Sequence, residues 1–487
     1  MVALGALAVR SAELQPKTVD DAYITFRYAE NWVAGFGPVY NPGERVEGYT
    51  CFLWMALLAV GHALGAATPV LAKVLGALAA GGTLVLLGTM DRWLSGADGR
   101  AAAAAALSLG ACGMFSGWAL SGMEVALVGL LVMATWSAHW ASHDRPGWAP
   151  AAGVFAALAA MTRPDAVLIV GAQTLEHLAQ RRWRVAGRHG AGFSVVFVPF
   201  WLGRWAWYGW FFPNTFYAKV GATSAQAWRG LHYTVDFLWP AAPLLLPLLF
   251  LPLVSRRGRF AGAVGWLLLH AVYVVAVGGD GMAAFRFYVP MLGPLAALGG
   301  LGWMALGDRV RGAWLLVVPF AALSWTLAHR HPELSRRFER GNVGRNGAEV
   351  GQWMAENLPS DALLATNTAG SVPYYARLPT IDMLGLNDAT IAHAVVPGMG
   401  SGKAGHEKAD GNYVLSRRPD WIQLGSARGS QRPVFQSGRQ LFGAPGFRRD
   451  YELQQFRLPS RRMLILWHRR DAPAARQAPL AGPPGSR

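Results

Sequence analysis

The chain has 487 residues, of which 53% are hydrophobic and only 15% charged, and its formal net charge is +16. So apolar a sequence excludes an ordinary water-soluble enzyme and indicates a multi-spanning membrane protein. Nucleic-acid binding is disfavoured despite the positive charge, because no nucleic-acid motif accompanies it and basic cytoplasmic loops together with a basic C-terminal domain account for it. The two cysteines, Cys51 and Cys112, stand in apolar surroundings and predict neither a disulfide framework nor a metal site.

The N-terminal apolar run, 1–9, ends at Arg10 and is shorter than the roughly 20 residues that a spanning helix needs. We expect either a first helix truncated at its start or a short stub. The apolar blocks that follow predict an α-helical polytopic membrane protein with about 10–11 transmembrane helices. They lie at 50–66, 70–90, 101–120, 122–141, 148–161, 166–179, 190–208, 237–254, 260–278, 287–306 and 312–328.

The densest basic loops, 181–188, 255–259 and 308–311, set the predicted orientation. Short cytoplasmic loops of membrane proteins are enriched in Lys and Arg, so we assign these three loops to the cytoplasm. Strict alternation of the spans then places everything after residue 329 on the outer side.

The same alternation has a consequence for the adjacent acids Asp20 and Asp21. They lie outside only if the block at 50–66 does not cross the bilayer. We therefore predict one long external loop, about 18–69, that contains an interfacial helix near 50–66.

The C-terminal part changes from apolar blocks to short alternating patterns and predicts a small extracytoplasmic α/β domain. Its segment 351–359 has helical spacing, and strand-like runs lie at 361–370, 413–424 and 461–470. The last residues are rich in Pro, Ala and Gly, which predicts disorder. The predicted domains are thus a transmembrane domain at 1–328, an α/β domain at 329–472 and a disordered tail at 473–487.

Asp20 and Asp21 are the strongest catalytic candidates in the sequence. Two neighbouring carboxylates in an external loop at the membrane surface are suited to general-base chemistry. The alternative is that they cap the helix that follows, where acids complement the helix dipole. Capping requires only one acid, and both interpretations can hold for different members of the pair.

Further polar residues of the external segments are candidates for substrate binding. A broken helix at 162–165 is of the kind that lines a polar cavity, and cations at 219 and 286 are suited to holding a phosphate. The alternatives are solvated surface charge, hydrated acids at helix ends and basic side chains that snorkel to the headgroups. The substrate-binding candidates are Arg27, Tyr28, Glu44, Arg45, Glu47, Tyr49, Glu124, Asp165, Asn214, Tyr217, Asp280, His406 and Glu407.

The sequence contains no recognisable spacing of metal-ligating residues. His406 and Glu407 share a glycine-bounded loop but lack the spacing of a zinc-protease helix. Paired acids such as Asp20 and Asp21 are also ligands for a divalent cation, so no cofactor is predicted and metal dependence stays open.

Eight segments occur in an order that is similar to a known family. They are DDAYITFRYAENW, VYNPGERVEGYT, LSGME, TRPDA, PNTFYAKV, GGDGMAAFRFYVP, TAGSVPYYARLPTIDMLGLND and GHEKADGNYVLSRRPDW, within about residues 18–425. Together they resemble bacterial membrane glycosyltransferases of the GT-C superfamily, most of all the terminal arabinofuranosyltransferases of actinobacterial cell walls. The resemblance implies a polyprenyl-phosphate sugar donor, a catalytic acid in the first external loop and action on the outer side of the bacterial inner membrane.

The sequence thus predicts transfer of a sugar, with arabinofuranose among the candidates, to a cell-envelope glycan or glycolipid. Asp20 or Asp21 is the predicted base of a single inverting displacement, and Lys219, Arg286 and Arg163 are predicted to bind the departing phosphate. Two alternatives stay open. One is a transporter or flippase of lipid-linked sugars, and the other is a non-catalytic homologue that assists envelope assembly.

Overall fold

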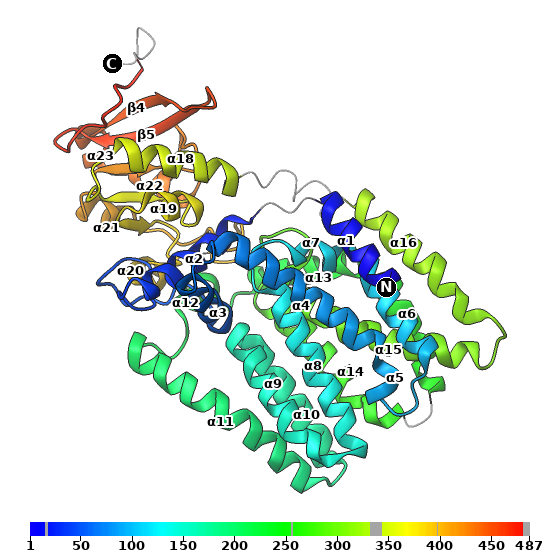
Figure 1. Cartoon of the computed structure of the whole chain (residues 1–487). Helices are drawn as coiled ribbons and strands as arrows, with labels where there is room; N and C mark the ends of the chain where they lie inside the picture. The colour runs from blue at the N-terminus through cyan, green and yellow to red at the C-terminus, as the bar shows by residue number, and fades with distance from the viewer. Residues whose placement is uncertain (15–17, 255–256, 332–342, 397, 481–487) are drawn as a thin grey trace.

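The computed structural model describes residues 1–14, 18–254, 257–331, 343–396 and 398–480. A bundle of helices is joined to a smaller unit built on a β-sheet, and α2, α3, α12 and α20 lie between the two (Figure 1). This architecture confirms the predicted fold class of a polytopic helical protein with a C-terminal α/β domain.

The bundle contains α-helices and short 3₁₀ segments. The α-helices are α1 (Val2–Leu14), α2 (Asp20–Val33), α3 (Phe52–Ala63), α4 (Thr68–Gly88), α5 (Met90–Trp93), α6 (Gly99–Gly110), α7 (Gly113–Ala119), α8 (Val125–Asp144), α9 (Ala149–Thr162), α10 (Val167–Ala179), α11 (Trp183–Tyr208), α12 (Asn214–Lys219), α13 (Ser224–Leu245), α14 (Ala261–Ala276), α15 (Leu292–Gly307) and α16 (Val317–Arg330). The 3₁₀ segments are η1 (Pro146–Trp148), η2 (Pro164–Ala166), η3 (Leu246–Leu253), η4 (Arg257–Phe260), η5 (Arg286–Met291) and η6 (Ala313–Leu316).

Within the described ranges, five helical segments are long and apolar enough to cross a membrane, and α6 with α7, bent by 66°, adds a sixth if the pair is one broken span. The five are Thr68–Gly88, Val125–Asp144, Ser224–Leu253, Gly258–Ala276 and Arg286–Gly307. This number is below the 10–11 predicted, because several apolar blocks fold into shorter helices. The block at 148–161 forms α9 with 14 residues, and that at 166–179 forms α10 with 13.

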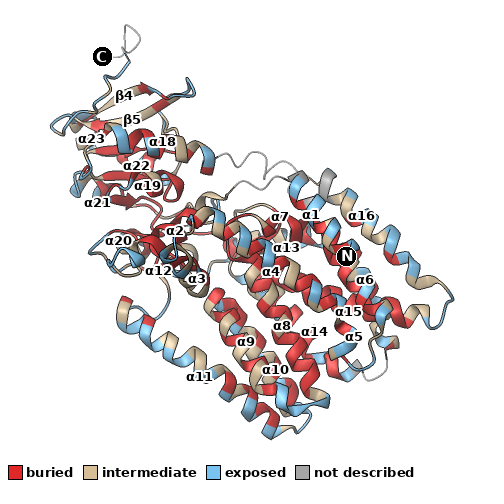
Figure 2. Ribbon diagram, viewed as in Figure 1, coloured by how far each residue is buried: buried red, intermediate tan, exposed pale blue. Residues whose placement is uncertain are grey.

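Burial separates an inner from an outer set of helices. Helices α8 and α15 are buried along almost their whole length, whereas α11 carries many exposed residues (Figure 2). The exposed side chains of α11 include Trp183, Val195, Val198, Leu202 and Trp205. A long, apolar and exposed helix face is what a lipid-facing helix requires.

Helix α3, in the block predicted to be interfacial, has 12 residues and is too short to span a bilayer. It packs between α2 and α4, so the loop at about 18–69 returns to the bundle through this helix. That α3 lies in the membrane interface stays a prediction.

The C-terminal unit is a five-stranded mixed sheet with helices around it, in the order β2-β1-β3-β5-β4. Strands β1, β2 and β3 run parallel, while β4 and β5 form an antiparallel pair at one edge. The elements are α18 (Val343–Asn357), β1 (Leu364–Thr366), α19 (Ser371–Ala376), β2 (Thr380–Asp382), α20 (Ala389–His393), α21 (Gly411–Ser416), β3 (Trp421–Gln423), α22 (Gln436–Gly443), α23 (Pro445–Asp450), β4 (Tyr451–Arg457) and β5 (Met463–Arg469).

The strand-like runs at 361–370 and 461–470 contain β1 and β5, as predicted. The run at 413–424 begins instead as helix α21, because Asp410 caps the Tyr413 N–H and starts a helix, and only its end forms β3. The predicted domain limits stay predictions, and residues 481–487 of the predicted disordered tail lie outside the described residues.

A buried arginine joins the two units. Arg27 on α2 donates to the main-chain oxygens of Pro373 (2.7 Å) and Leu378 (2.8 Å) in the α/β unit. Within its own loop it donates to the Tyr40 oxygen (2.7 Å) and Asn41 Oδ1 (3.1 Å). A buried guanidinium is tolerated only when its donors are paired, so the position of α2 and that of the α/β unit determine each other.

We expect Arg27→Met to destabilise the chain by about 2–4 kcal/mol, because several buried oxygens lose a charged donor at the interface of the two units. Thermal unfolding of the detergent-solubilised chain measures this effect. The matched control is Arg45→Met, since Arg45 is exposed and its guanidinium lies over the Trp207 ring face, 4.2 Å from the centroid. Equal losses in the two variants would contradict the interface role of Arg27.

Candidate functional site

Charged side chains converge where α2, the start of α8, α12 and η5 meet. Lys219, the last residue of α12, lies within electrostatic reach of Asp21, Glu124 and Asp280. Arg286, the first residue of η5, lies within electrostatic reach of the same three acids. Four segments that are far apart in sequence therefore contribute to one cluster, and all five of these residues were predicted to be site residues.

Asp20 is fixed by the α/β unit. Its carboxylate accepts a hydrogen bond from the Ser371 N–H (2.9 Å) and a second one from the Ser371 hydroxyl. Burial raises the pKa of Asp20 to about 6, although these hydrogen bonds oppose the rise. The N-cap of α2 is Val19 and no side chain caps the helix, so neither acid is a capping residue, whereas both lie in the first turn, where acids complement the helix dipole.

Asp21 differs from its neighbour. Within the described part of the chain its carboxylate makes no hydrogen bond, and the residue is only partly buried. It is within electrostatic reach of Lys219, Arg286 and His406. Of the two acids, Asp21 is thus the one whose oxygens are open to another molecule.

Two of the three predicted phosphate-binding cations are already paired with acids. Arg286 Nε lies 2.7 Å from Asp280 Oδ2, and Arg163 Nε lies 3.0 Å from Asp165 Oδ1. Both guanidinium groups flank the ring of Phe287, at 5.3 and 4.7 Å from its centroid. Each arginine is therefore held in place by a carboxylate and an aromatic face.

Lys219 is the exception. Its ammonium group has no ion pair or hydrogen bond within the described ranges, and burial lowers its pKa while Asp21 opposes that change. The helix end is held by Gln226, which donates to the Lys219 oxygen (2.9 Å) and accepts from the Gly221 N–H (2.9 Å). An unpaired, partly desolvated ammonium beside a free carboxylate is suited to binding an anion.

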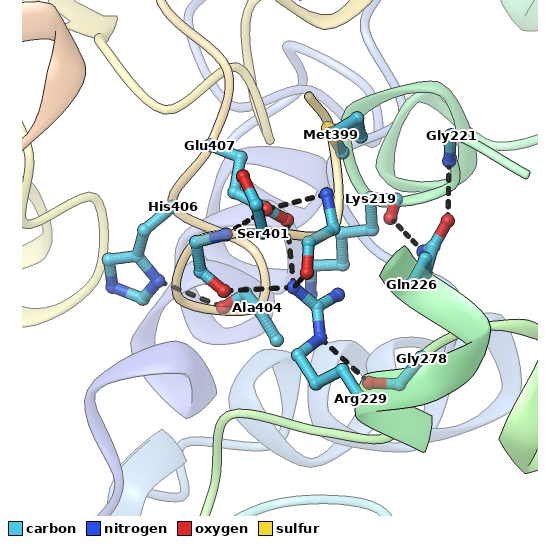
Figure 3. A network of polar contacts seen from close by, with 12 residues as sticks. Lys219, Gly221, Gln226, Arg229, Gly278, Met399, Ser401, Ala404, His406 and Glu407 are labelled. Atoms are coloured by element: carbon cyan, nitrogen blue, oxygen red, sulfur yellow. Dashed lines mark hydrogen bonds and ion pairs between the residues drawn. The ribbon is translucent and has the colours of Figure 1, made fainter. Parts of the chain in front are cut away.

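A loop of the α/β unit, 398–407, packs against this end of the bundle (Figure 3). Arg229 on α13 donates to the main-chain oxygens of Gly400 (3.1 Å), Gly402 (3.0 Å) and Gly278 (3.0 Å). It also pairs with Glu407 (3.1 Å), whose other oxygen accepts from the Gly400 and Gly402 N–H groups. Glu407, a predicted substrate-binding residue, is thus placed as a support of the loop.

His406 precedes this support on the same loop. Its Nδ1 lies 3.0 Å from the Ala404 oxygen, and its ring packs on Phe435 at 4.9 Å between centroids. Burial lowers its pKa, so the neutral imidazole is favoured. It lies at the rim of the charged cluster.

The remaining predicted residues are engaged by the protein itself. Glu47 accepts from Arg204 (2.9 Å), and Asn214 donates to the oxygens of Gly385 and Leu386 in the turn before α20. The predicted binding residues that the structure occupies with such contacts, in addition to Arg27, are Tyr28, Glu44, Arg45, Glu47, Tyr49, Asn214 and Tyr217. They shape the walls around the cluster and do not meet at its centre.

An apolar recess of about 280 Å³ lies beside the Glu47–Arg204 pair. Its lining includes Tyr49, Phe52, Pro199, Phe200, Trp207 and Tyr208. It lies between the loop that follows α2 and helix α11, whose apolar side chains are exposed.

Sequence reasoning missed Ser371, Arg229 and the placement of His270 in this site. His270 Nδ1 lies 3.9 Å from Asp165 Oδ2, and its Nε2 lies 2.8 Å from the Phe287 oxygen. No local signal marks Arg229, whereas Ser371 stands within the motif TAGSVPYY and could have been nominated as a partner for a buried acid.

The geometry can be compared with known proteins. The chain is 32% identical over 348 residues to the terminal beta-(1->2)-arabinofuranosyltransferase of Mycobacterium tuberculosis, which covers 61% of this chain and 55% of that protein. The protein of the same name from Corynebacterium glutamicum is 26% identical over 363 residues, 63% of this chain and 51% of that protein. The resemblance drawn from the sequence motifs is therefore confirmed. The chain spans about half the length of the curated relatives it matches.

The crystal structure of ArnT from Cupriavidus metallidurans bound to undecaprenyl phosphate superposes with a TM-score of 0.56, at 17% identity, over 78% of this chain and 84% of that one. The chain has the ArnT fold. The apo form of ArnT gives a TM-score of 0.53 at 18% identity. A family model described as a domain of unknown function, DUF8728, matches residues 335–474, which include the whole mixed sheet.

We expect Arg229→Met to loosen the loop at 398–407, because three main-chain oxygens lose a charged donor. Hydrogen bonds to charged groups are worth roughly 1.5–3 kcal/mol, so amide exchange in this loop should accelerate about tenfold or more. Hydrogen–deuterium exchange of the detergent-solubilised chain measures it. Arg432→Met, at an exposed position of the same unit, is the control, and unchanged exchange at 398–407 in Arg229→Met would contradict the assignment.

Proposed function

We propose that this chain is a membrane glycosyltransferase that transfers a sugar from a polyprenyl-phosphate donor to a cell-envelope glycan or glycolipid. The observation that carries the proposal is the proximity of the Asp21 carboxylate and the Lys219 ammonium, neither of which has a side-chain partner among the described residues, in a bundle with the ArnT fold. The names of the similar curated proteins support arabinofuranose as the sugar.

Asp21 is the base in this proposal. It takes the proton of the acceptor hydroxyl while the hydroxyl oxygen attacks the anomeric carbon of the donor. The bond from that carbon to the phosphate oxygen breaks, and polyprenyl phosphate leaves with the bonding electrons. Because phosphate monoesters are fair leaving groups, the step requires no general acid. Asp20, held by Ser371, positions the first turn of α2 and is a positioning residue.

Lys219 binds the phosphate that leaves, with Arg286 and Arg163 behind it. The two arginines are neutralised by Asp280 and Asp165, so a phosphate gains most from the unpaired ammonium. Fixed cations in a site poor in water stabilise a developing anion more strongly than they do in bulk water.

The isoprenoid chain of the donor fits the apolar recess beside Trp207 and the exposed face of α11. ArnT, whose fold this chain shares, was crystallised with undecaprenyl phosphate, which supports a donor of this class. The orientation proposed from the basic loops places the site on the outer side of the bacterial inner membrane.

Asp21→Asn should lower transfer from a synthetic polyprenyl-phosphate sugar by about 10²- to 10⁴-fold, the usual contribution of a general base. Asp20→Asn keeps a side-chain oxygen that can accept the hydrogen bonds of Ser371, so we expect this variant to lose less transfer activity than Asp21→Asn. The control is Asp361→Asn, at an exposed acid of the α/β unit. Full activity of Asp21→Asn would contradict the proposed role of Asp21 as the base.

Product formation in detergent, where the membrane no longer separates two sides, distinguishes an enzyme from a transporter. A single displacement also predicts inversion at the anomeric carbon, which the NMR coupling constants of the product report.

Lys219→Met should lower kcat/KM for the donor by about 10- to 100-fold, because one charge-assisted contact of roughly 1.5–3 kcal/mol is lost. Lys219→Arg keeps the charge and should recover part of the loss. Lys73→Met, on α4, is the matched control because no site contact involves Lys73. A Lys219→Met enzyme with unchanged kcat/KM would remove Lys219 from phosphate binding.

A further inference from the structure

A second polar cluster is buried in the bundle, at the other end of α8. His139 and His143 are four residues apart, so they lie on the same face of α8, and Glu176 and His177 project from α10 beside them. At about 1.5 Å per residue, α8 separates these histidines from Glu124 in the charged cluster by roughly 20–30 Å. The proposed transfer reaction uses none of them.

Glu176 is the centre of this group. Its Oε2 lies 3.0 Å from His139 Nε2, and its Oε1 lies 3.3 Å from His143 Nε2. The three ligand atoms all lie within 4.8 Å of one another. The Gly262 N–H, at the start of α14, donates to Glu176 Oε2 (3.0 Å) and fixes the carboxylate in place.

Several buried polar atoms around Glu176 lack a partner among the described residues. They include both ring nitrogens of His177, Nδ1 of His139 and both amide atoms of Gln173, and all three side chains are fully buried. The His177 ring lies 4.6 Å from that of His139 and 5.8 Å from that of His143. Buried polar atoms without a partner cost free energy, so a fully buried His177 with two free nitrogens calls for a ligand.

We propose that His139, His143 and Glu176 bind a divalent cation of the borderline class, with Zn²⁺ the best match. Imidazole nitrogens and a carboxylate oxygen are its usual ligands, and donors about 2.1 Å from a tetrahedral Zn²⁺ lie roughly 3.4 Å apart. The separations of 3.0 and 3.3 Å require only small side-chain rotations to meet this value. His177 packs against these ligands, with its ring 4.6 Å from that of His139, and is not one of the three whose ligand atoms lie within 4.8 Å of one another.

The site links helices that do not follow one another directly in the chain. Its ligands lie on α8 and α10, with α9 between them in sequence, and Glu176 also binds the start of α14. His189 on α11 extends the cluster, with its ring 6.2 Å from that of His177. A bound cation would stabilise the packing of α8, α10 and α14 at this end of the bundle, whereas the proposed transfer reaction takes place in the charged cluster at the opposite end.

The test is the metal content of the full chain, purified in detergent with an affinity tag free of histidine. We expect about one equivalent of Zn²⁺ per chain by inductively coupled plasma mass spectrometry, and visible d–d absorption bands after replacement of the metal by Co²⁺. Glu176→Gln, which keeps the shape of the side chain, and His139→Ala should each lower the bound metal at least tenfold. His232→Ala, at an exposed histidine of α13, should retain it.

A chelator should lower the unfolding temperature of the unmodified chain and leave that of Glu176→Gln unchanged, so the comparison stands even if His139→Ala folds poorly. Two results would overturn the proposal: an unmodified chain that retains neither Zn²⁺ nor Co²⁺ after loading, or a Glu176→Gln variant that binds as much as the unmodified chain. Either would identify the cluster as a hydrogen-bonded His–Glu network only.

Discussion

The burial of Arg27 is the constraint on which the site depends. Its guanidinium is taken out of water, so its donors must meet acceptors, and the oxygens of Pro373 and Leu378 are available only when the α/β unit sits against α2. The same docking brings Ser371 to Asp20. The position of the acid pair is therefore set by a unit that begins more than 300 residues later in the chain, and the site is a joint product of bundle and sheet.

The charged residues of the site fall into two sets, those that are paired within the protein and those that are not. Arg286 and Arg163 are each neutralised by a carboxylate, which reduces the cost of burying them. Among the described residues, the side chains of Asp21 and Lys219 make neither a hydrogen bond nor an ion pair, so in the proposed function a hydroxyl group can approach one and an anion the other. Direct pairing of these two groups would lower the energy of the empty site and weaken its attraction for such a ligand.

Much of this arrangement could be predicted from the sequence. Asp21, Glu124, Lys219, Asp280 and Arg286 stand out because charged residues at the ends of apolar blocks are costly and so are usually functional. Sequence could not separate them from Glu47 or Asn214, whose partners, Arg204 and the 385–386 main chain, are decided by tertiary packing. Arg229 and the His139–Glu176 cluster were missed for the same reason, since each depends on helices brought together by the fold. Hydropathy also could not show how the apolar blocks divide into helices, because it does not reveal that α9 and α10 have only 14 and 13 residues.

The loop at 398–407, beside the charged cluster, is anchored to the bundle through its main chain. Arg229 and Glu407 bind its main chain at Gly400 and Gly402, and Gly400 adopts a positive φ of 102° that favours glycine. The conformation of the loop is thus specified by two charged anchors and its glycines, and the Ser401 hydroxyl adds a hydrogen bond to the Gly398 oxygen (2.6 Å). Because Arg229 belongs to α13 and Glu407 to the loop, their ion pair ties the shape of this loop of the α/β unit to the position of a helix of the bundle.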